Sequence, residues 1–248
     1  MFNNYRDCFP SGPIGLVPAF DADVADQLHF RILSGNNANL VHLNETSGEI
    51  NLSNHLNTNV PKLASMDISV TDGVNEVKAT MTLSVRLISE TMLLNSVTVR
   101  LADMTVQAFL SPLLGFFVDA LAAIIPCPRD MVYLFDVKED TDVPARILNV
   151  SFSARRPDLP GEVYFTPQYL QERVYLNRPI LARLSTVRVL PFDDNLCLRE
   201  PCLNFEKCLT VLKFGNASDF IASDSVLFRP IHPVSTFACV CPTGFTGT

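Results

Sequence analysis

Apolar and polar residues alternate in short runs along the first ninety positions, and these runs predict β-strands. They lie at residues 28–32, 64–70 and 77–87, and in the last run every second residue from Val77 to Leu87 is apolar. Such alternation gives a strand one apolar face. Turn signals rich in glycine, such as Ser34-Gly35-Asn36, separate the runs. The pattern therefore predicts an all-β sandwich over residues 1–91.

Residues 92–192 have a mixed pattern. Apolar residues recur every three to four positions from Val106 to Ile124, which predicts an amphipathic helix. Asp103 is one candidate for its N-cap, and Ser111-Pro112 is an alternative start. Further strands are predicted at 97–101, 131–137, 147–154 and 186–190, and a second helix at 167–184 that can break at Pro179. The order β-α-β-β-α-β is that of a ferredoxin-like α+β unit.

The longest apolar run, at residues 109–125, is predicted to be a buried helix. Pro112, Gly115 and Asp119 interrupt it, and it is shorter than a comfortable membrane span. A charge near mid-span would cost about 3 kcal/mol. We expect no membrane-spanning segment here. The N-terminus has neither a basic start nor an apolar core, so we also expect no signal peptide and an origin inside a longer protein.

Composition narrows the functional class. Of the 248 residues, 48% are hydrophobic and 18% charged, as in globular chains, and the net charge of −7 argues against a nucleic-acid partner. The sequence has no glycine-rich phosphate loop and no HExxH motif. The only thiol–histidine option pairs Cys8 with one of the four histidines, in no recognisable nucleophile motif. We expect neither an enzyme nor a small-molecule substrate.

Five of the seven cysteines crowd into the last fifth of the chain, which indicates an oxidising compartment. Four Asn-x-Ser/Thr triplets, at Asn44, Asn51, Asn149 and Asn216, are candidate glycosylation sites. Cys8 and Cys127 lie far in sequence from the other cysteines and from each other. They can bond each other or stay free, or Cys8 can have a partner elsewhere, because a bridge needs α-carbons within about 7 Å.

The C-terminal cysteine spacing resembles an epidermal-growth-factor-like module. It reads Cys197-x4-Cys202-x5-Cys208, then a gap of 30 residues, then Cys239-x-Cys241-Pro-Thr-Gly-Phe-Thr-Gly. The resemblance implies disulfides Cys197–Cys208 and Cys202–Cys239, with the sixth cysteine, the partner of Cys241, missing from the sequence. A zinc site is the alternative, disfavoured because paired Cys-x2-Cys or histidine ligand spacing is absent.

The first ninety residues resemble a cadherin repeat, in the stretches 17–23, 46–50 and 70–73. The resemblance implies a calcium half-site made of Asp21, Asp23 and Asp72. These fall short of the six to eight oxygens that calcium takes, so calcium should bind weakly or not at all. The alternative is that the three aspartates only cap turns. Residues 87–91 read Leu-Ile-Ser-Glu-Thr where the family has acidic ligands, so no calcium is expected at that junction.

The middle module resembles membrane-adjacent, SEA-like domains. Self-cleaving SEA domains need a Gly-Ser pair that the turn at 139–144 lacks. A degenerate cadherin repeat (1–91), a SEA-like domain (92–192) and a truncated growth-factor-like module (193–248) follow in the order found in Flamingo, or starry night, type seven-pass cadherins. The stretches 109–115, 149–154, 190–202 and 227–231 are specific to this resemblance.

This resemblance implies the extracellular part of a plasma-membrane, G-protein-coupled receptor that acts in planar cell polarity by pairing with the same protein on a neighbouring cell. Our hypothesis is that the segment is a calcium-independent structural spacer joining the cadherin array to membrane-proximal modules. The alternative is a protein-binding or self-associating module for cis or trans partners, with the 30-residue loop before Cys239 as its surface.

Overall fold

The computed structural model divides the chain into two compact units. Unit 1 contains Met1–Leu87 and Ala217–Pro230, and unit 2 contains Ile88–Asn216 and Ile231–Thr248. The structure describes residues 2–3, 9, 12–23, 25–53, 56, 62–191, 196–199, 202–203, 206–216, 218–242 and 244. The chain thus passes from one unit to the other three times. The division into modules at residues 91 and 192 stays a prediction.

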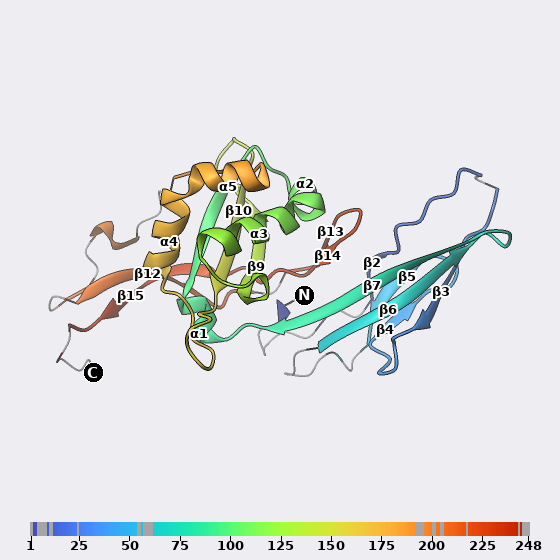
Figure 1. The fold of residues 1–248 in the computed structure, drawn as a ribbon, viewed down its shortest axis with the longest axis horizontal. Helices are drawn as coiled ribbons and strands as arrows, with labels where there is room; N and C mark the ends of the chain where they lie inside the picture. The colour runs from blue at the N-terminus through green and yellow to red at the C-terminus, as the bar shows by residue number, and fades with distance from the viewer. Residues whose placement is uncertain are drawn as a thin grey trace. The chain divides into compact units, whose positions relative to one another are not determined.

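Unit 1 contains two β-sheets that are built mainly from the predicted strands. One sheet has the order β1-β7-β6-β3 and the other the order β2-β5-β4. All neighbours are antiparallel except β1 and β7, and Figure 1 shows the long β6–β7 hairpin. The strands are β1 (Phe2–Asn3), β2 (Pro13–Leu16), β3 (His29–Ser34), β4 (Val41–Leu43), β5 (Glu49–Leu52), β6 (Lys62–Thr71) and β7 (Glu76–Leu87).

The core of unit 1 lies around Val41, Ile50 and Met66, all buried. The apolar face predicted on β7 is buried only toward the end of the strand, since Val85 is 1% exposed and Val77 69%. Gly35 follows β3 with φ +85°, and a Cβ there would lie 1.9 Å from the carbonyl oxygen of Ser65. Only glycine fits this close approach between strands.

Unit 1 also takes in a short hairpin from much later in the chain. Its strands are β13 (Ile221–Ala222) and β14 (Leu227–Phe228), which pair antiparallel. Phe220 and Leu227 pack against the core of this unit. No sequence pattern predicted that this segment belongs with the first ninety residues.

Unit 2 contains a four-stranded antiparallel sheet of order β11-β8-β10-β9. The main helices lie over one face of this sheet in Figure 1. The buried residues Leu148, Val150 and Phe152 alternate along the central strand β10. The strands are β8 (Ser96–Ala102), β9 (Val132–Glu139), β10 (Ile147–Ala154) and β11 (Arg188–Val189). The helices are α1 (Glu90–Leu94), α2 (Val106–Ala108), α3 (Leu114–Ile124), α4 (Pro167–Leu176) and α5 (Arg178–Ser185), with short turns η2 (Phe109–Leu113), η3 (Arg129–Met131) and η4 (Leu196–Arg199).

The first predicted helix starts differently from the expectation. Thr105, not Asp103, is its N-cap, and the Thr105 side chain accepts a hydrogen bond from the Ala108 N–H. Asp103 has φ +55° and pairs with Arg188 instead, so the prediction that it caps the helix was wrong. At Ser111 the backbone leaves helical geometry, and α3 follows. The break expected in the second helix is confirmed, between α4 and α5.

The stretch Val106–Ile124 is long and apolar enough to cross a membrane by length and composition alone. Its Phe109, Phe117 and Leu121 are fully buried, and the rings of Phe109 and Phe117 meet edge to face at 5.5 Å. α3 contacts α5 and β9. This burial is typical of a core helix, whose apolar stripe packs on its own sheet.

The C-terminal part of unit 2 is an antiparallel ladder of β12 (Lys207–Lys213) and β15 (Val234–Val240). Cys208 lies directly opposite Cys239 in this ladder, and Lys213 opposite Val234. Residues 214–233 therefore form a long loop that begins and ends at the same end of the ladder. This excursion contains the hairpin that joins unit 1.

Candidate functional site

The structure brings together two of the three predicted calcium ligands and adds a third aspartate. Carboxylate oxygens of Asp21, Asp26 and Asp72 lie within 4.8 Å of one another. The Asp23 carboxylate instead accepts a hydrogen bond from the Ala25 N–H, 3.0 Å away. Sequence reasoning missed Asp26, although it lies in the same acidic stretch. The three carboxylates on their own fall short of a calcium shell of six to eight oxygens.

These aspartates also have local structural roles. Asp72 accepts hydrogen bonds from the backbone N–H of Val74 and from the backbone N–H and side chain of Asn75, at 2.5–2.9 Å. The side-chain bond from Asn75 is the main cause that lowers the pKa of Asp72 to about 2. Asp21 accepts from the Asp23 N–H. Turn capping accounts for these geometries without a metal.

The junction that follows β7 is a capped helix rather than an acidic linker. Ser89 is the N-cap of α1, and its Oγ accepts a hydrogen bond from the Met92 N–H at 3.2 Å. Glu90 lies in the first turn, where a negative charge is favourable. Ile88 and Leu93 are fully buried within unit 2. Hydrophobic burial and a helix cap thus hold residues 88–94 in place.

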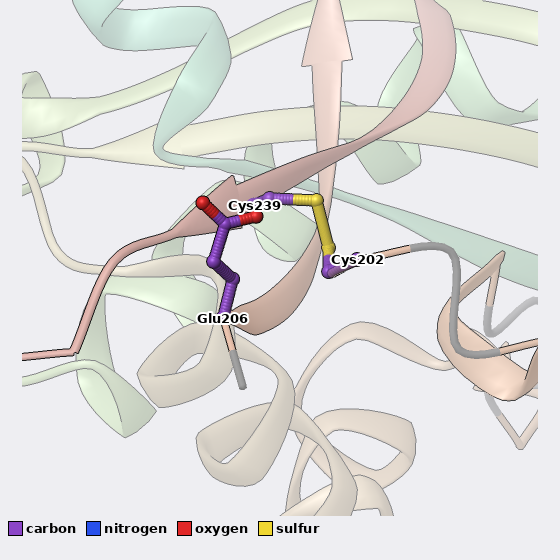
Figure 2. Close-up of side chains that lie close together, drawn as sticks. All are labelled: Cys202, Glu206 and Cys239. Carbon is purple, nitrogen blue, oxygen red and sulfur yellow. A yellow bond between two sulfur atoms is a disulfide. The ribbon is translucent and has the colours of Figure 1, made fainter. Parts of the chain in front are cut away.

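Two disulfides hold the C-terminal part of unit 2, in the pairs that the resemblance implies. Cys197 bonds Cys208, and Cys202 bonds Cys239. Figure 2 shows the second bridge with the carboxylate of Glu206 beside it. The three side chains lie close enough to hold a metal ion. Because both sulfurs are joined in a disulfide, neither is a thiolate, and this cluster lacks the ligands that a zinc site needs.

The remaining cysteines differ in their surroundings. Cys127 is a free, buried thiol, and burial raises its pKa to about 11, with a smaller effect from the charge of Asp130. Cys241 is a free, half-buried thiol whose sulfur lies 3.5 Å from Glu206 Oε1. Cys8 lies outside the described residues. The predicted alternatives for Cys8 therefore stay open.

A polar cluster lies within unit 2 on strands β8, β9 and β10. Asp136 is 5% exposed, and its Oδ1 lies 2.6 Å from His232 Nδ1. Ser151 Oγ donates to Asp136 Oδ2 at 3.4 Å and lies 2.8 Å from Thr98 Oγ1. The carboxylate thus stands between the serine and the histidine. In a nucleophilic triad the histidine stands between them, so this arrangement is structural rather than catalytic.

The four predicted glycosylation triplets lie in different settings. Asn216 is exposed, next to the point where the chain enters unit 1. Asn44 is exposed too, but its side chain accepts three hydrogen bonds from Thr46 and Ser47. Asn51 and Asn149 are half-buried within strands β5 and β10. By accessibility, Asn44 and Asn216 are the better candidates of the four, and glycosylation at each stays a prediction.

Known proteins match the chain from end to end. A family model described as CELSR2-like, ninth cadherin domain, matches residues 1–84. The protocadherin-like wing polarity protein stan of Drosophila melanogaster is 73% identical over the whole chain, which covers 7% of that protein. The human cadherin EGF LAG seven-pass G-type receptors 1 and 2 are 49% and 50% identical, again over all of the chain, which covers 8% and 9% of them.

The chain spans less than a tenth of the length of these three relatives. An alignment over the whole chain, two disulfides near the C-terminus and a β-rich unit at the N-terminus agree with one another. The chain therefore corresponds over its whole length to a segment of the Flamingo-type seven-pass cadherins, and its residues 1–84 match the model of the ninth cadherin domain.

Proposed function

We propose that the chain is an ectodomain segment of a homophilic cell–cell adhesion receptor acting in planar cell polarity. Within that receptor, the segment is a calcium-independent structural spacer that joins the cadherin array to membrane-proximal modules. The names of the relatives support the receptor class, since one is a wing polarity protein and the others are seven-pass cadherin receptors. The partner is the same protein on a neighbouring cell, and calcium binds this segment weakly or not at all.

The observation that carries the spacer role is the junction after β7. Calcium-dependent linkers hold their shape through carboxylates that repel one another until the cation binds. Here Ser89 caps a helix, and the buried side chains of Ile88 and Leu93 fix its position. Such a junction keeps its conformation with or without calcium.

Three modules follow one another in this proposal: a cadherin repeat at 1–91, a SEA-like domain at 92–192 and a growth-factor-like module at 193–248. The sheet order β11-β8-β10-β9 supports a ferredoxin-like fold for the second, because the third strand of a split β-α-β unit lies between the first and the second. The β9–β10 turn lacks the Gly-Ser pair that self-cleavage needs. The third module rests on the two disulfides.

Sedimentation velocity of the purified chain, with calcium and with a chelator, tests the spacer role. We expect a monomer with one sedimentation coefficient in both conditions, and no change in the Asp21→Asn, Asp72→Asn double variant. A calcium-dependent dimer that this variant abolishes would instead support the alternative, a self-associating module. Asp142→Asn, which changes an exposed turn in unit 2, is the matched control.

A further inference from the structure

The hairpin of β13 and β14 belongs to the cadherin-repeat unit although it lies between two strands of the growth-factor-like module. The ladder of β12 and β15 ends at the pair Lys213 and Val234, and Ala217–Pro230 are part of unit 1. A loop of this length within such a module needs a physical reason, because ordering each of its residues costs about 1–2 kcal/mol of conformational entropy.

The hairpin fits into the apolar interior of the repeat. Phe220 and Leu227 pack against the core cluster that contains Val41 and Ile50. The fit at Gly15 on β2 is close, since a Cβ at this position would lie 2.5 Å from Leu227 Cδ2. An alanine at position 15 would therefore displace the end of the Leu227 side chain.

The base of the hairpin is buried as well. Arg229 is 4% exposed, and its guanidinium lies over the ring of Phe9, 4.7 Å from the ring centroid. Arg229 Nε donates to the carbonyl oxygen of Ser218, and the Ser218 N–H donates to the carbonyl oxygen of Pro230. Burying a guanidinium is costly, and here the hydrogen bond to Ser218 and the contact with the Phe9 ring offset part of that cost.

The hairpin also forms one wall of an open, largely apolar cavity of about 960 Å³. Its other walls include β2 and β7, with Leu16 and Val77 among the lining residues, and Phe220 and Leu227 line it from the hairpin. Without the hairpin, the sides of β2 and β5 that face it would be exposed to solvent. Exposing apolar surface of this kind opposes folding in proportion to its area.

We propose that residues 217–230 are a structural part of the cadherin domain, which reaches its full stability only when this hairpin is seated. The ninth cadherin domain of this chain is then discontinuous in sequence. Its first ninety residues form an incomplete folding unit, and a growth-factor-like module supplies the missing wall. Because Phe220 and Leu227 pack against the core of unit 1, they are not part of a surface that binds other proteins.

A double-variant cycle in the full chain tests this proposal, with hydrogen exchange of β2 and β5 as the readout. Leu227→Ala alone should speed exchange in both strands at least tenfold, because it opens the packed contact. Gly15→Ala alone should do the same by displacing Leu227. The double variant should exchange no faster than Leu227→Ala, because the added methyl group takes the vacated space.

The control pairs Gly15→Ala with Leu203→Ala, which removes a leucine that is 75% exposed in unit 2. That pair should show only the effect of Gly15→Ala. Should Gly15→Ala fail to fold, Phe220→Ala with Leu227→Ala gives the same readout. Unchanged exchange in β2 and β5 would overturn the proposal, as would strictly additive effects of Gly15→Ala and Leu227→Ala or an equal rise in β8 and β10 of unit 2.

Discussion

His232 Nδ1 lies 2.6 Å from Oδ1 of Asp136, and this pair joins the polar cluster on β8, β9 and β10 to the segment that leads into β15. The next backbone bond reinforces it, since the Ile231 N–H donates to the carbonyl oxygen of Phe135. Asp136 is almost completely buried, whereas the His232 side chain is 30% exposed. The histidine therefore acts as the partner that makes a buried carboxylate tolerable.

Removing this partner should destabilise unit 2. His232→Ala leaves the Asp136 carboxylate with the longer bond from Ser151 and should lower the free energy of unfolding by about 1–3 kcal/mol, the usual cost of a buried polar group that loses its partner. Urea unfolding followed by hydrogen exchange of β9 and β10 measures the change. His42→Ala, at an exposed position of β4, is the control and should have no effect on these strands. Equal stability of both variants would show that Asp136 needs no histidine.

Local patterns predicted most strands of this fold but not the contacts between distant ones. The strand at 147–154 was predicted with its observed bounds, since it needs only a β-branched and aromatic run between turn signals. The candidates for the N-cap were Asp103 and Ser111, and Thr105 was missed because all three residue types cap helices and only backbone geometry separates them. Asp136 and His232 are 96 residues apart and share no local signal.

The hairpin shows the same limit more clearly. Leu227 and Gly15 meet through tertiary packing, and neither residue has a sequence context that indicates the other. The candidate ligands were predicted in part, because the resemblance to a cadherin repeat implies Asp21 and Asp72, whereas Asp26 joins them only through the folding of the chain. Sequence periodicity reports which face of an element is apolar, and it does not report what covers that face.

Cys127 should be nearly inert toward alkylating reagents in the native chain. Its pKa of about 11 leaves on the order of one thiolate in a thousand at pH 8, so iodoacetamide should react about a hundredfold more slowly than with an unperturbed cysteine. Peptide mass spectrometry after timed labelling gives the rate, and labelling in urea gives the unprotected reference. Complete native labelling within minutes at pH 8 would contradict the burial of this thiol.

Asp72 should make the stability of unit 1 depend on pH in the acid range. A carboxyl group whose pKa falls from 3.8 to about 2 on folding stabilises the folded state above pH 3.8, and this contribution is lost as the pH falls through about 2. Asp72→Asn should therefore be less stable than the parent at pH 7, and the difference should shrink between pH 4 and pH 2. Urea unfolding at each pH measures it.

Asp224→Asn, which changes an exposed turn in the same unit, is the control for that series and should follow the parent chain at every pH. The hydrogen bonds to Val74 and Asn75 explain the direction of the effect, because each favours the charged carboxylate. A constant difference between Asp72→Asn and the parent down to pH 2 would mean that the carboxyl group matters for shape alone and not for charge.

Breaking the Cys202–Cys239 disulfide tests whether packing alone holds the β13–β14 hairpin in unit 1 or whether the disulfide is needed as well. The bridge closes a loop with a sequence separation of 37, so the Cys202→Ser, Cys239→Ser double variant should lose about 2–5 kcal/mol in the stability of the β12–β15 ladder. Cys241→Ser, which leaves both disulfides intact, is the control.

Peptide-level hydrogen exchange of the double variant then shows which strand contacts persist. If β12 and β15 exchange quickly while β13 and β14 stay protected, the cadherin core holds the hairpin by packing alone. If all four strands open together, the hairpin stays seated only while the disulfide keeps its two ends paired.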